Sequence, residues 1–186
     1  MTLLILGLLL WAATHFYKRV APQQRQAMTD RLGNRSKGVF AVLILISVVL
    51  MVLGYRSAVG EFYWGRTAAT TGINNLLMIL AVILFGLGDS KSRFRGSLRH
   101  PMLTGMIVWA VAHILVNGDT PSFVLFGGLA LWAIVEMIVI NRSEPDYTPK
   151  EPGTLAGDVR LLVISAVVFT VIVGIHTWLG YSPFGA

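Results

Sequence analysis

The sequence contains no cysteine, and only 13% of its 186 residues are charged. The absence of cysteine excludes disulfide scaffolds, thiolate catalysis, iron–sulfur clusters and covalently attached c-type haem. Soluble domains carry about 25% charged residues, so this chain is too poor in charge to cover a water-exposed surface. Hydrophobic residues make up 55% of the chain. These proportions predict an integral membrane protein whose first partner is the lipid bilayer.

Acidic residues are also few: nine Asp and Glu stand against fifteen Lys and Arg, which gives a formal charge of +6. In a soluble protein such an excess would suggest nucleic acid as a partner. Here the cations lie between apolar stretches and not on one continuous surface, so they indicate membrane topology and no nucleic-acid binding.

The charged residues separate six long apolar stretches, each near the roughly 20 residues that a helix needs to cross a bilayer. We therefore expect an all-α integral membrane bundle of six transmembrane helices in one domain, 1–186. The expected helices cover approximately residues 2–17, 38–55, 68–88, 101–117, 121–140 and 160–179. The first stretch has no basic start, and Lys18 and Arg19 follow it, so we expect a retained helix and not a cleaved signal peptide.

The cations are distributed unevenly among the connections between these stretches. Those after the first, third and fifth stretches hold six, four and three Lys or Arg residues, whereas the second holds only Arg56 and Arg66. By the positive-inside rule, the cation-rich connections face the cytoplasm and both termini face outward. The polar stretch 141–158 contains several prolines and is expected to be a loop.

Ionisable residues inside a membrane are costly, so each is a candidate functional residue. The sequence places five in or at the apolar stretches: His15, His100, His113, Glu136 and His176. There is no HExxH pair and no glycine-rich phosphate loop after a strand, which excludes zinc-protease and nucleotide-binding sites.

Two of the histidines share a local pattern. Trp11 precedes His15 in WAATH, and Trp109 precedes His113 in WAVAH. A four-residue step puts each Trp and His on one helix face, and the small residues between them would admit a flat ligand or another helix. An interfacial Trp and a chance match are the alternative explanation.

The depths of His15 and His113 in the membrane favour a shared site over a chance match. Each lies 12 or 13 residues into its stretch, about 18–20 Å along a helix. The two stretches run in opposite directions and side chains lean toward their own N-terminus, so both rings would lean toward the bilayer centre. Two such imidazoles suit the axial positions of one haem iron. An inverted three-plus-three repeat would give the same arrangement, although the other stretches show no matching signature.

The fourth stretch carries a stripe of soft, aromatic and polar side chains at helical spacing, namely Met102, Met106, Trp109, His113 and Asn117. It suits the wall of a haem or polyene site and equally suits an ordinary helix interface.

The other ionisable residues have different expected roles. His100 is about 220° around the helix from His113, which favours an interfacial or capping role. His176 is the more credible substitute ligand. Glu136 could pair with His100 or with a cationic residue of a connection, could belong to a proton path, or could be an ordinary interfacial carboxylate.

The run LRHPMLTGMIVWAVAHILVNGD, residues 98–119, resembles the signature of the NnrU family of bacterial membrane proteins, which is related to 15-cis-zeta-carotene isomerase. The stretch from Trp11 to Gly33 and the ending IHTWLGYSPF are similar to that family too. NnrU proteins are associated with denitrification gene clusters, and their isomerase relatives bind haem b through two histidines. The resemblance therefore implies a haem b-binding protein of the bacterial inner membrane with a redox or accessory role in nitric oxide and nitrite metabolism.

Matched by motif, the haem ligands of the relatives fall on His15 and His113. Trp11, Trp109 and Met106 are then expected beside the haem, with His176 or His100 as substitute ligands. The haem propionates would need cations, which Arg99, Lys18 or Arg19 could supply.

Other functions remain open at this point. The isomerase relatives suggest cis–trans isomerisation of a carotenoid-like polyene, with the haem as its cofactor. A cofactor-free assembly or transport partner of a respiratory reductase is a third candidate. Membrane methyltransferases share the RHP motif, but the proline-rich run NRSEPDYTPKEPG replaces their downstream donor-binding residues.

Overall fold

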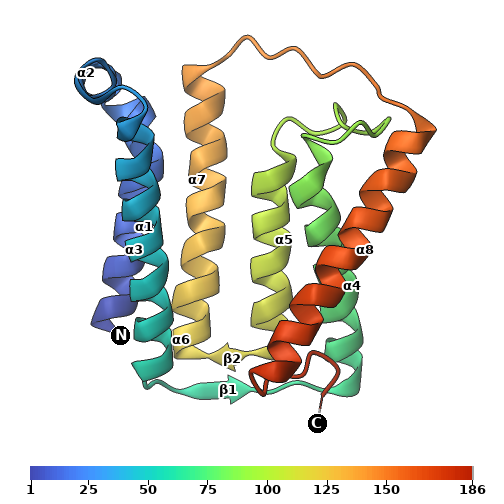
Figure 1. Ribbon diagram of the computed structural model, residues 1–186. Helices are drawn as coiled ribbons and strands as arrows, with labels where there is room; N and C mark the ends of the chain where they lie inside the picture. The colour runs from blue at the N-terminus through green and yellow to red at the C-terminus, as the bar shows by residue number, and fades with distance from the viewer. Residues whose placement is uncertain (186) are drawn as a thin grey trace. The chain divides into compact units, whose positions relative to one another are not determined.

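The structure is a computed structural model that describes residues 1–185 (Figure 1). Ala186, which the predicted single domain includes, lies outside the described residues. Contacts within the chain divide it into two compact units. Unit 1 comprises Met1–Phe62 and Asp119–Ser143, and unit 2 comprises Tyr63–Gly118 and the chain from Glu144 onward.

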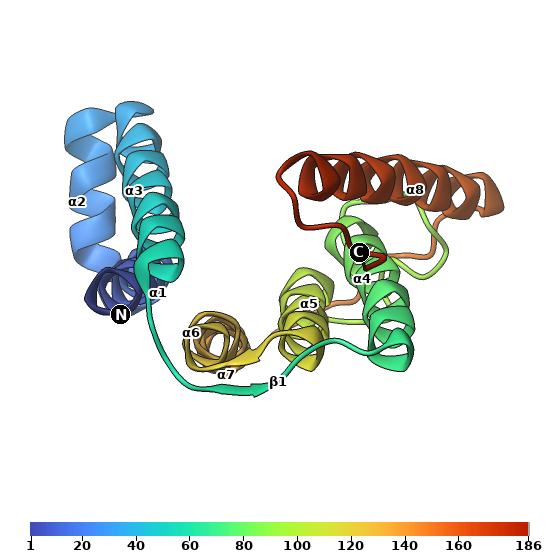
Figure 2. The same ribbon diagram turned by 90° about the horizontal axis from the view of Figure 1, so that it is seen from below.

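Unit 1 contains α1 (Thr2–Val20), α2 (Pro22–Leu32), α3 (Arg35–Ser57), the short α6 (Thr120–Ser122), a π-helical turn η1 (Phe123–Gly127) and α7 (Gly128–Ser143). Small residues let α1 and α3 lie side by side, as Figure 2 shows. Gly7 faces the backbone of Ser47, and Gly54 lies against the backbone of Leu4. Membrane helices associate through such close packing because, in lipid, there is no hydrophobic driving force that brings helices together.

The stretch from Thr120 to Ser143 forms one long helical span with an altered turn near its start. Asp119 Oδ1 accepts a 2.8 Å hydrogen bond from the backbone N–H of Ser122, which caps the span. The hydroxyl groups of Tyr55 and Ser122 lie 2.9 Å apart, so α3 holds the same turn. Gly128 lies against the side chain of Leu8, which brings α7 to α1.

Unit 2 contains three helices: α4 (Ala68–Leu87), α5 (Pro101–Val116) and α8 (Leu155–Trp178). Each begins with a local start signal. Thr67 and Thr70 form a capping box before α4, Pro101 opens α5, and Thr154 Oγ1 accepts a hydrogen bond from Gly157 N at the start of α8. Residues at each helix start therefore satisfy or replace the backbone N–H groups that the first turn leaves without partners.

The helices of unit 2 pack through α4. Gly105 of α5 lies against the carbonyl of Ala81, and Leu84 and Leu87 of α4 form a buried cluster with Leu161 of α8. The buried residues of α8 are Gly157, Leu161 and Ser165, which fall at four-residue steps on one face. The remaining faces of α8 are therefore apolar and exposed.

Two short strands carry the chain between the units: β1 (Phe62–Trp64) leads out of unit 1, and β2 (Gly118–Asp119) leads back into it. Within unit 1, Thr120 N donates to the carbonyl of Glu61 at 3.0 Å. Within unit 2, Trp64 Nε1 donates to the carbonyl of Ile114 at 3.2 Å, and the indole lies against Gly118.

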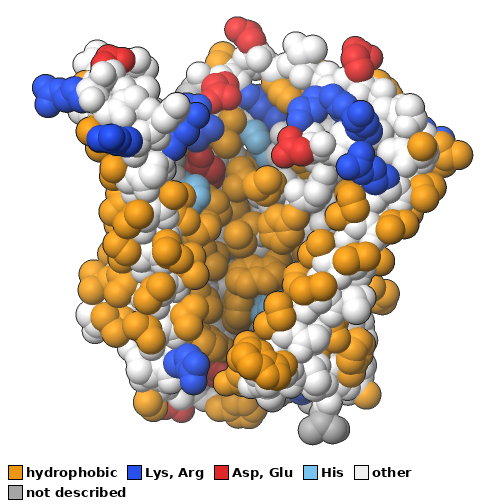
Figure 3. All heavy atoms as spheres, in the orientation of Figure 1, with side chains coloured by type: hydrophobic (Ala, Val, Ile, Leu, Met, Phe, Trp, Pro, Cys, Tyr) orange, Lys and Arg blue, Asp and Glu red, His pale blue; other side chains and the backbone are white. Residues whose placement is uncertain are grey.

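Within residues 1–185, five helical spans are long and apolar enough to cross a membrane: α1, α3, α4, Thr120–Ser143 and α8. The sixth apolar helix, α5, has 16 residues and is shorter than these. Hydrophobic side chains cover much of the helix surfaces in Figure 3, and only 6% of the most apolar part of α8 is buried. Such faces suit hydrocarbon and not water, so this is a mostly helical membrane protein.

The observed helices agree with the predicted stretches and differ at their ends. α2 was not expected, because Pro22–Leu32 is too polar to span a membrane. It is nevertheless helical, with Pro22 in its first turn and with hydrogen bonds from Arg25 to Thr29 and from Gln26 to Asp30. The expected loop 141–158 is shorter, because α7 continues to Ser143 and α8 begins at Leu155.

Candidate functional site

In unit 1, His15 lies between two tryptophan rings. Its ring centroid is 4.3 Å from that of Trp11 on the same helix and 4.8 Å from that of Trp132 on α7. The two indoles meet edge to face, with their centroids 5.3 Å apart. Sequence analysis did not identify Trp132. Its signal was its position one helical turn before Glu136, the same step that links Trp11 to His15.

Hydrogen bonding fixes which ring nitrogen of His15 carries the proton when the ring is neutral. Nδ1 lies 2.8 Å from the carbonyl oxygen of Trp11. Since a carbonyl only accepts, Nδ1 carries the proton and donates. In the neutral ring, Nε2 then has its lone pair directed outward, which is the arrangement that metal-ligating histidines use.

An ion pair lies one helical turn beyond the aromatic cluster. Arg19 Nη1 on α1 donates to Glu136 Oε1 on α7 at 2.6 Å, and only 7% of the glutamate side chain is exposed. This is the cation partner among the alternatives predicted for Glu136. Arg19 therefore neutralises a buried carboxylate and is less available as a propionate partner.

The buried polar atoms that have no hydrogen-bond partner within residues 1–185 include Trp11 Nε1, Trp132 Nε1 and Glu136 Oε2. Buried polar atoms without a partner are costly and are rare in folded proteins. Here the two donors belong to the indoles that pack on His15, and the acceptor lies one helical turn beyond Trp132. A group bound at this cluster could therefore form hydrogen bonds with these atoms.

In unit 2, His113 repeats the geometry of His15. Its ring centroid is 4.7 Å from that of Trp109, and Nδ1 lies 2.8 Å from the Trp109 carbonyl oxygen. Asn117 Nδ2 donates to the carbonyl of His113 at 2.8 Å. The shared WxxxH spacing thus produces the same local structure twice. Because His15 and His113 belong to different units, the meeting of their rings stays a prediction.

His176 lies in unit 2. It lines a groove together with Trp109, the indole that packs on the His113 ring. His176 Nδ1 lies 2.8 Å from the carbonyl oxygen of Ile172, so this ring also directs Nε2 outward.

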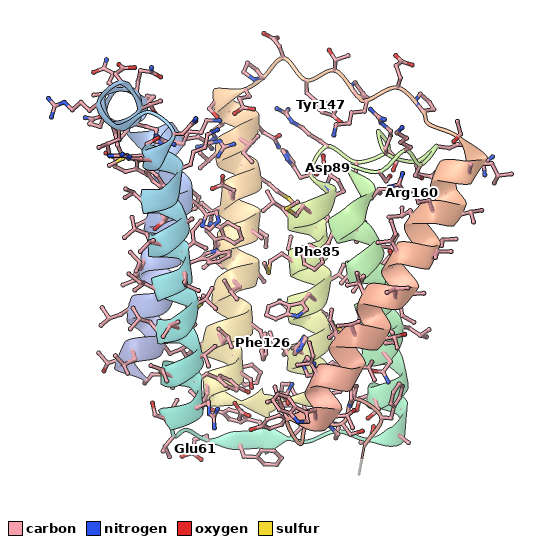
Figure 4. The ribbon with its side chains drawn as sticks, in the orientation of Figure 1. Glu61, Phe85, Asp89, Phe126, Tyr147 and Arg160 are labelled. Carbon is pink, nitrogen blue, oxygen red and sulfur yellow. The ribbon has the colours of Figure 1, made fainter. Side chains whose placement is uncertain are left out.

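A groove of about 390 Å³ runs among α4, α5 and α8. It is almost wholly apolar, and its lining is Met78, Val82, Phe85, Gly86, Trp109, Leu161, Ile164, Ser165, Val168, Ile172 and His176. Figure 4 labels Phe85 on α4. Neither Met102 nor Met106 lines this groove, so the predicted stripe on α5 contributes only Trp109 to it.

The remaining predicted residues lie at the start of α5. His100 occupies the position just before the helix, where its carbonyl accepts hydrogen bonds from the backbone and hydroxyl of Thr104. Arg99 donates to the carbonyl of Glu144, and its guanidinium lies 4.9 Å from the ring centroid of Tyr147. Figure 4 labels Tyr147 on the connection before α8. Arg99 therefore helps to hold that connection.

A family model described as NnrU protein matches residues 3–183. The chain belongs to the NnrU family. The match covers both units, so both histidine–tryptophan pairs of this NnrU protein lie within the family region. Comparison with curated proteins and with solved structures gave no match.

The histidines of this NnrU protein suit a group that brings most of its own ligands. Among the described residues, no cluster of three or more His, Cys, Asp or Glu side chains can hold a bare metal ion. A haem macrocycle supplies four nitrogens and needs one or two protein ligands. A histidine whose Nδ1 is bonded to a carbonyl and whose ring packs on an indole meets that need.

Proposed function

We propose that this NnrU protein binds one b-type haem, with His15 and His113 as axial ligands and His176 as the substitute ligand. The observation that carries the proposal is the Nδ1–H bond of each histidine to the carbonyl four residues earlier. This bond orients each ring through Nδ1, so Nε2 is the nitrogen that would ligate iron. The bound haem would supply one-electron redox chemistry, in a redox or accessory role in nitrogen-oxide metabolism.

The residues around each histidine have defined tasks in this proposal. Trp11 and Trp132 hold the His15 ring between them, and Trp109 supports His113. Apolar helix faces exclude water. Because Arg19 is bonded to Glu136 and Arg99 to the carbonyl of Glu144, Lys18 is the preferred propionate partner.

The proposed setting is the bacterial inner membrane, with six spans and both termini outward. The distribution of Lys and Arg among the connections supports this orientation. α5 is then the shortest span, which local thinning of the bilayer or tilting of neighbouring helices can accommodate.

An absorption spectrum of the purified chain tests the proposal. The protein is expressed with sufficient haem supply, and spectra are recorded as isolated and after dithionite. We expect a Soret band, with sharpened α and β bands on reduction. A preparation that is folded and lacks any Soret band contradicts the proposal.

Two alternatives from the sequence remain predictions with their own tests. A polyene isomerase would change the pigments of cells that accumulate the cis polyene, as followed by chromatography. A cofactor-free assembly or transport partner would co-purify with a larger respiratory complex and carry no pigment.

A further inference from the structure

The groove in unit 2 has the length of an extended lipid tail. Its lining on α8 runs from Leu161 to His176, fifteen residues apart, which corresponds to about 22 Å along the helix. Met78 and Phe85 form part of the wall on α4. A narrow apolar channel of this kind suits a linear hydrophobic chain better than a compact molecule.

One end of the groove is polar. His176 lines it at the C-terminal end of α8, and Trp109 supplies an aromatic face in the wall. The Nδ1 proton of His176 is bonded to Ile172, so Nε2 is the atom that accepts a hydrogen bond from a ligand. The groove therefore offers an acceptor at the C-terminal end of α8 and a flat aromatic surface in its wall.

The chemistry of the head distinguishes the candidate lipids. None of the described residues that line the groove is charged, so a phosphate head group would lack the cations that it needs. A pure polyene would fill the channel and leave the acceptor on His176 unused. A hydroxylated ring on an isoprenoid tail satisfies both ends of the groove.

We propose that this groove binds an isoprenoid quinol. A ring hydroxyl of the quinol donates a hydrogen bond to Nε2 of His176, and the tail lies along α8 toward Leu161. The inference concerns binding alone. It does not depend on the proposed haem, and it places a membrane-soluble redox carrier near His113.

Binding of two probes to the purified full-length chain in detergent micelles tests the proposal by titration calorimetry. The probes are decylubiquinol and decylbenzene, which share a tail. The ubiquinol ring also carries methoxy and methyl groups, but only its two hydroxyls can donate a hydrogen bond to Nε2 of His176. We expect decylubiquinol to bind about tenfold more tightly, the ratio that one buried hydrogen bond gives. Equal affinity for the two probes overturns the proposal, and this comparison needs no variant.

Three variants locate the contact. His176→Ala is expected to weaken decylubiquinol binding about tenfold and to leave decylbenzene binding unchanged. His176→Gln restores part of the affinity, because its amide oxygen accepts. Ile164→Trp fills the groove and weakens binding of both probes. His100→Ala, outside the groove, is the matched control, and an unchanged quinol affinity in His176→Ala contradicts the proposal.

Two further outcomes separate this inference from its competitors. Phosphatidylglycerol that displaces decylubiquinol from the wild-type chain would make the groove a phospholipid site. Loss of a Soret band in His176→Ala, with the band retained in His15→Ala, would make His176 a haem ligand. Either result overturns quinol binding at this position, whereas absence of haem with intact quinol binding removes only the proposed function.

Discussion

Arg19 on α1 and Glu136 on α7 form a buried ion pair, with Nη1 and Oε1 2.6 Å apart. The pair lies one helical turn beyond His15 on α1 and one turn beyond Trp132 on α7. The ladder of Trp11, His15 and Arg19 thus faces Trp132 and Glu136. Each charge is tolerated inside unit 1 because its partner is present.

Removal of one partner should be strongly destabilising. Glu136→Ala leaves the Arg19 cation without its carboxylate, and loss of one member of a buried pair costs about 3–5 kcal/mol. Glu136→Gln keeps a hydrogen-bond acceptor and should cost less. Denaturant titration in mixed micelles measures the free energy of unfolding.

The exposed pair of Lys150 and Asp89 is the control, with 47% and 85% of their side chains exposed. Asp89 is labelled in Figure 4. Asp89→Ala should change the free energy of unfolding by about 1 kcal/mol at most, since surface pairs contribute little. Similar losses in Glu136→Ala and Asp89→Ala would contradict a buried role for Arg19 and Glu136.

The proposed haem ligands predict which histidine variants lose haem and which retain it. His15→Ala and His113→Ala should each reduce haem retention, because each removes one Nε2 donor. His100→Ala should retain haem, since His100 precedes α5 and lies away from the face of His113. The haem-to-protein ratio, taken from the Soret and protein absorbance, measures the effect. Equal retention in all three variants would argue against the assigned ligands.

Much of this architecture is predictable because lipid imposes a simple rule. A run of apolar residues long enough to cross the bilayer must be helical, so the spans around His15, His113 and His176 follow from composition. The stack of Trp on His also follows from the four-residue step. Local geometry is thus encoded within single helices.

The features that the sequence did not predict depend on contacts between helices, or lie in a segment where polar composition and helix signals point to different structures. Trp132 joins His15 only because α7 packs on α1, and no pattern within either segment reveals that pairing. The pairing of Arg19 with Glu136 was one of several alternatives for the same reason. α2 was missed because its polarity suggested a loop, although Pro22 and the spacing from Arg25 to Thr29 are helix signals.

Close packing of α1 and α3 predicts opposite effects for two glycines of one helix. A Cβ atom at Gly54 would lie 2.6 Å from Leu4 Cα, whereas one at Gly38 would have nothing within 4 Å. Gly54→Ala should force the helices apart and cost about 1–3 kcal/mol. Gly38→Ala should be neutral or stabilising by up to about 1 kcal/mol, since alanine favours the helix. Thermal unfolding in micelles compares them, and equal stabilities would refute the contact.

Asp158 holds the connection between α4 and α5 to the start of α8. Its Oδ1 accepts hydrogen bonds from Ser92 Oγ at 2.7 Å and from Arg93 N at 2.8 Å, and its Oδ2 accepts one from Arg93 Nε at 2.6 Å. Three bonds to one carboxylate keep the basic segment 91–99 folded against α8. Asp158→Ala should therefore open that segment.

Limited trypsin digestion measures this opening, because Lys91, Arg93, Arg95 and Arg99 are cleavage sites once the backbone is free. We expect cleavage of Asp158→Ala in segment 91–99 about tenfold faster than in the wild type, since local opening controls proteolysis. Asp158→Asn should be intermediate, because its amide oxygen still accepts from Ser92. Glu151→Ala, on the exposed connection before α8, is the matched control. If Asp158→Ala and Glu151→Ala are cleaved at the same rate, the carboxylate of Asp158 does not restrain the segment.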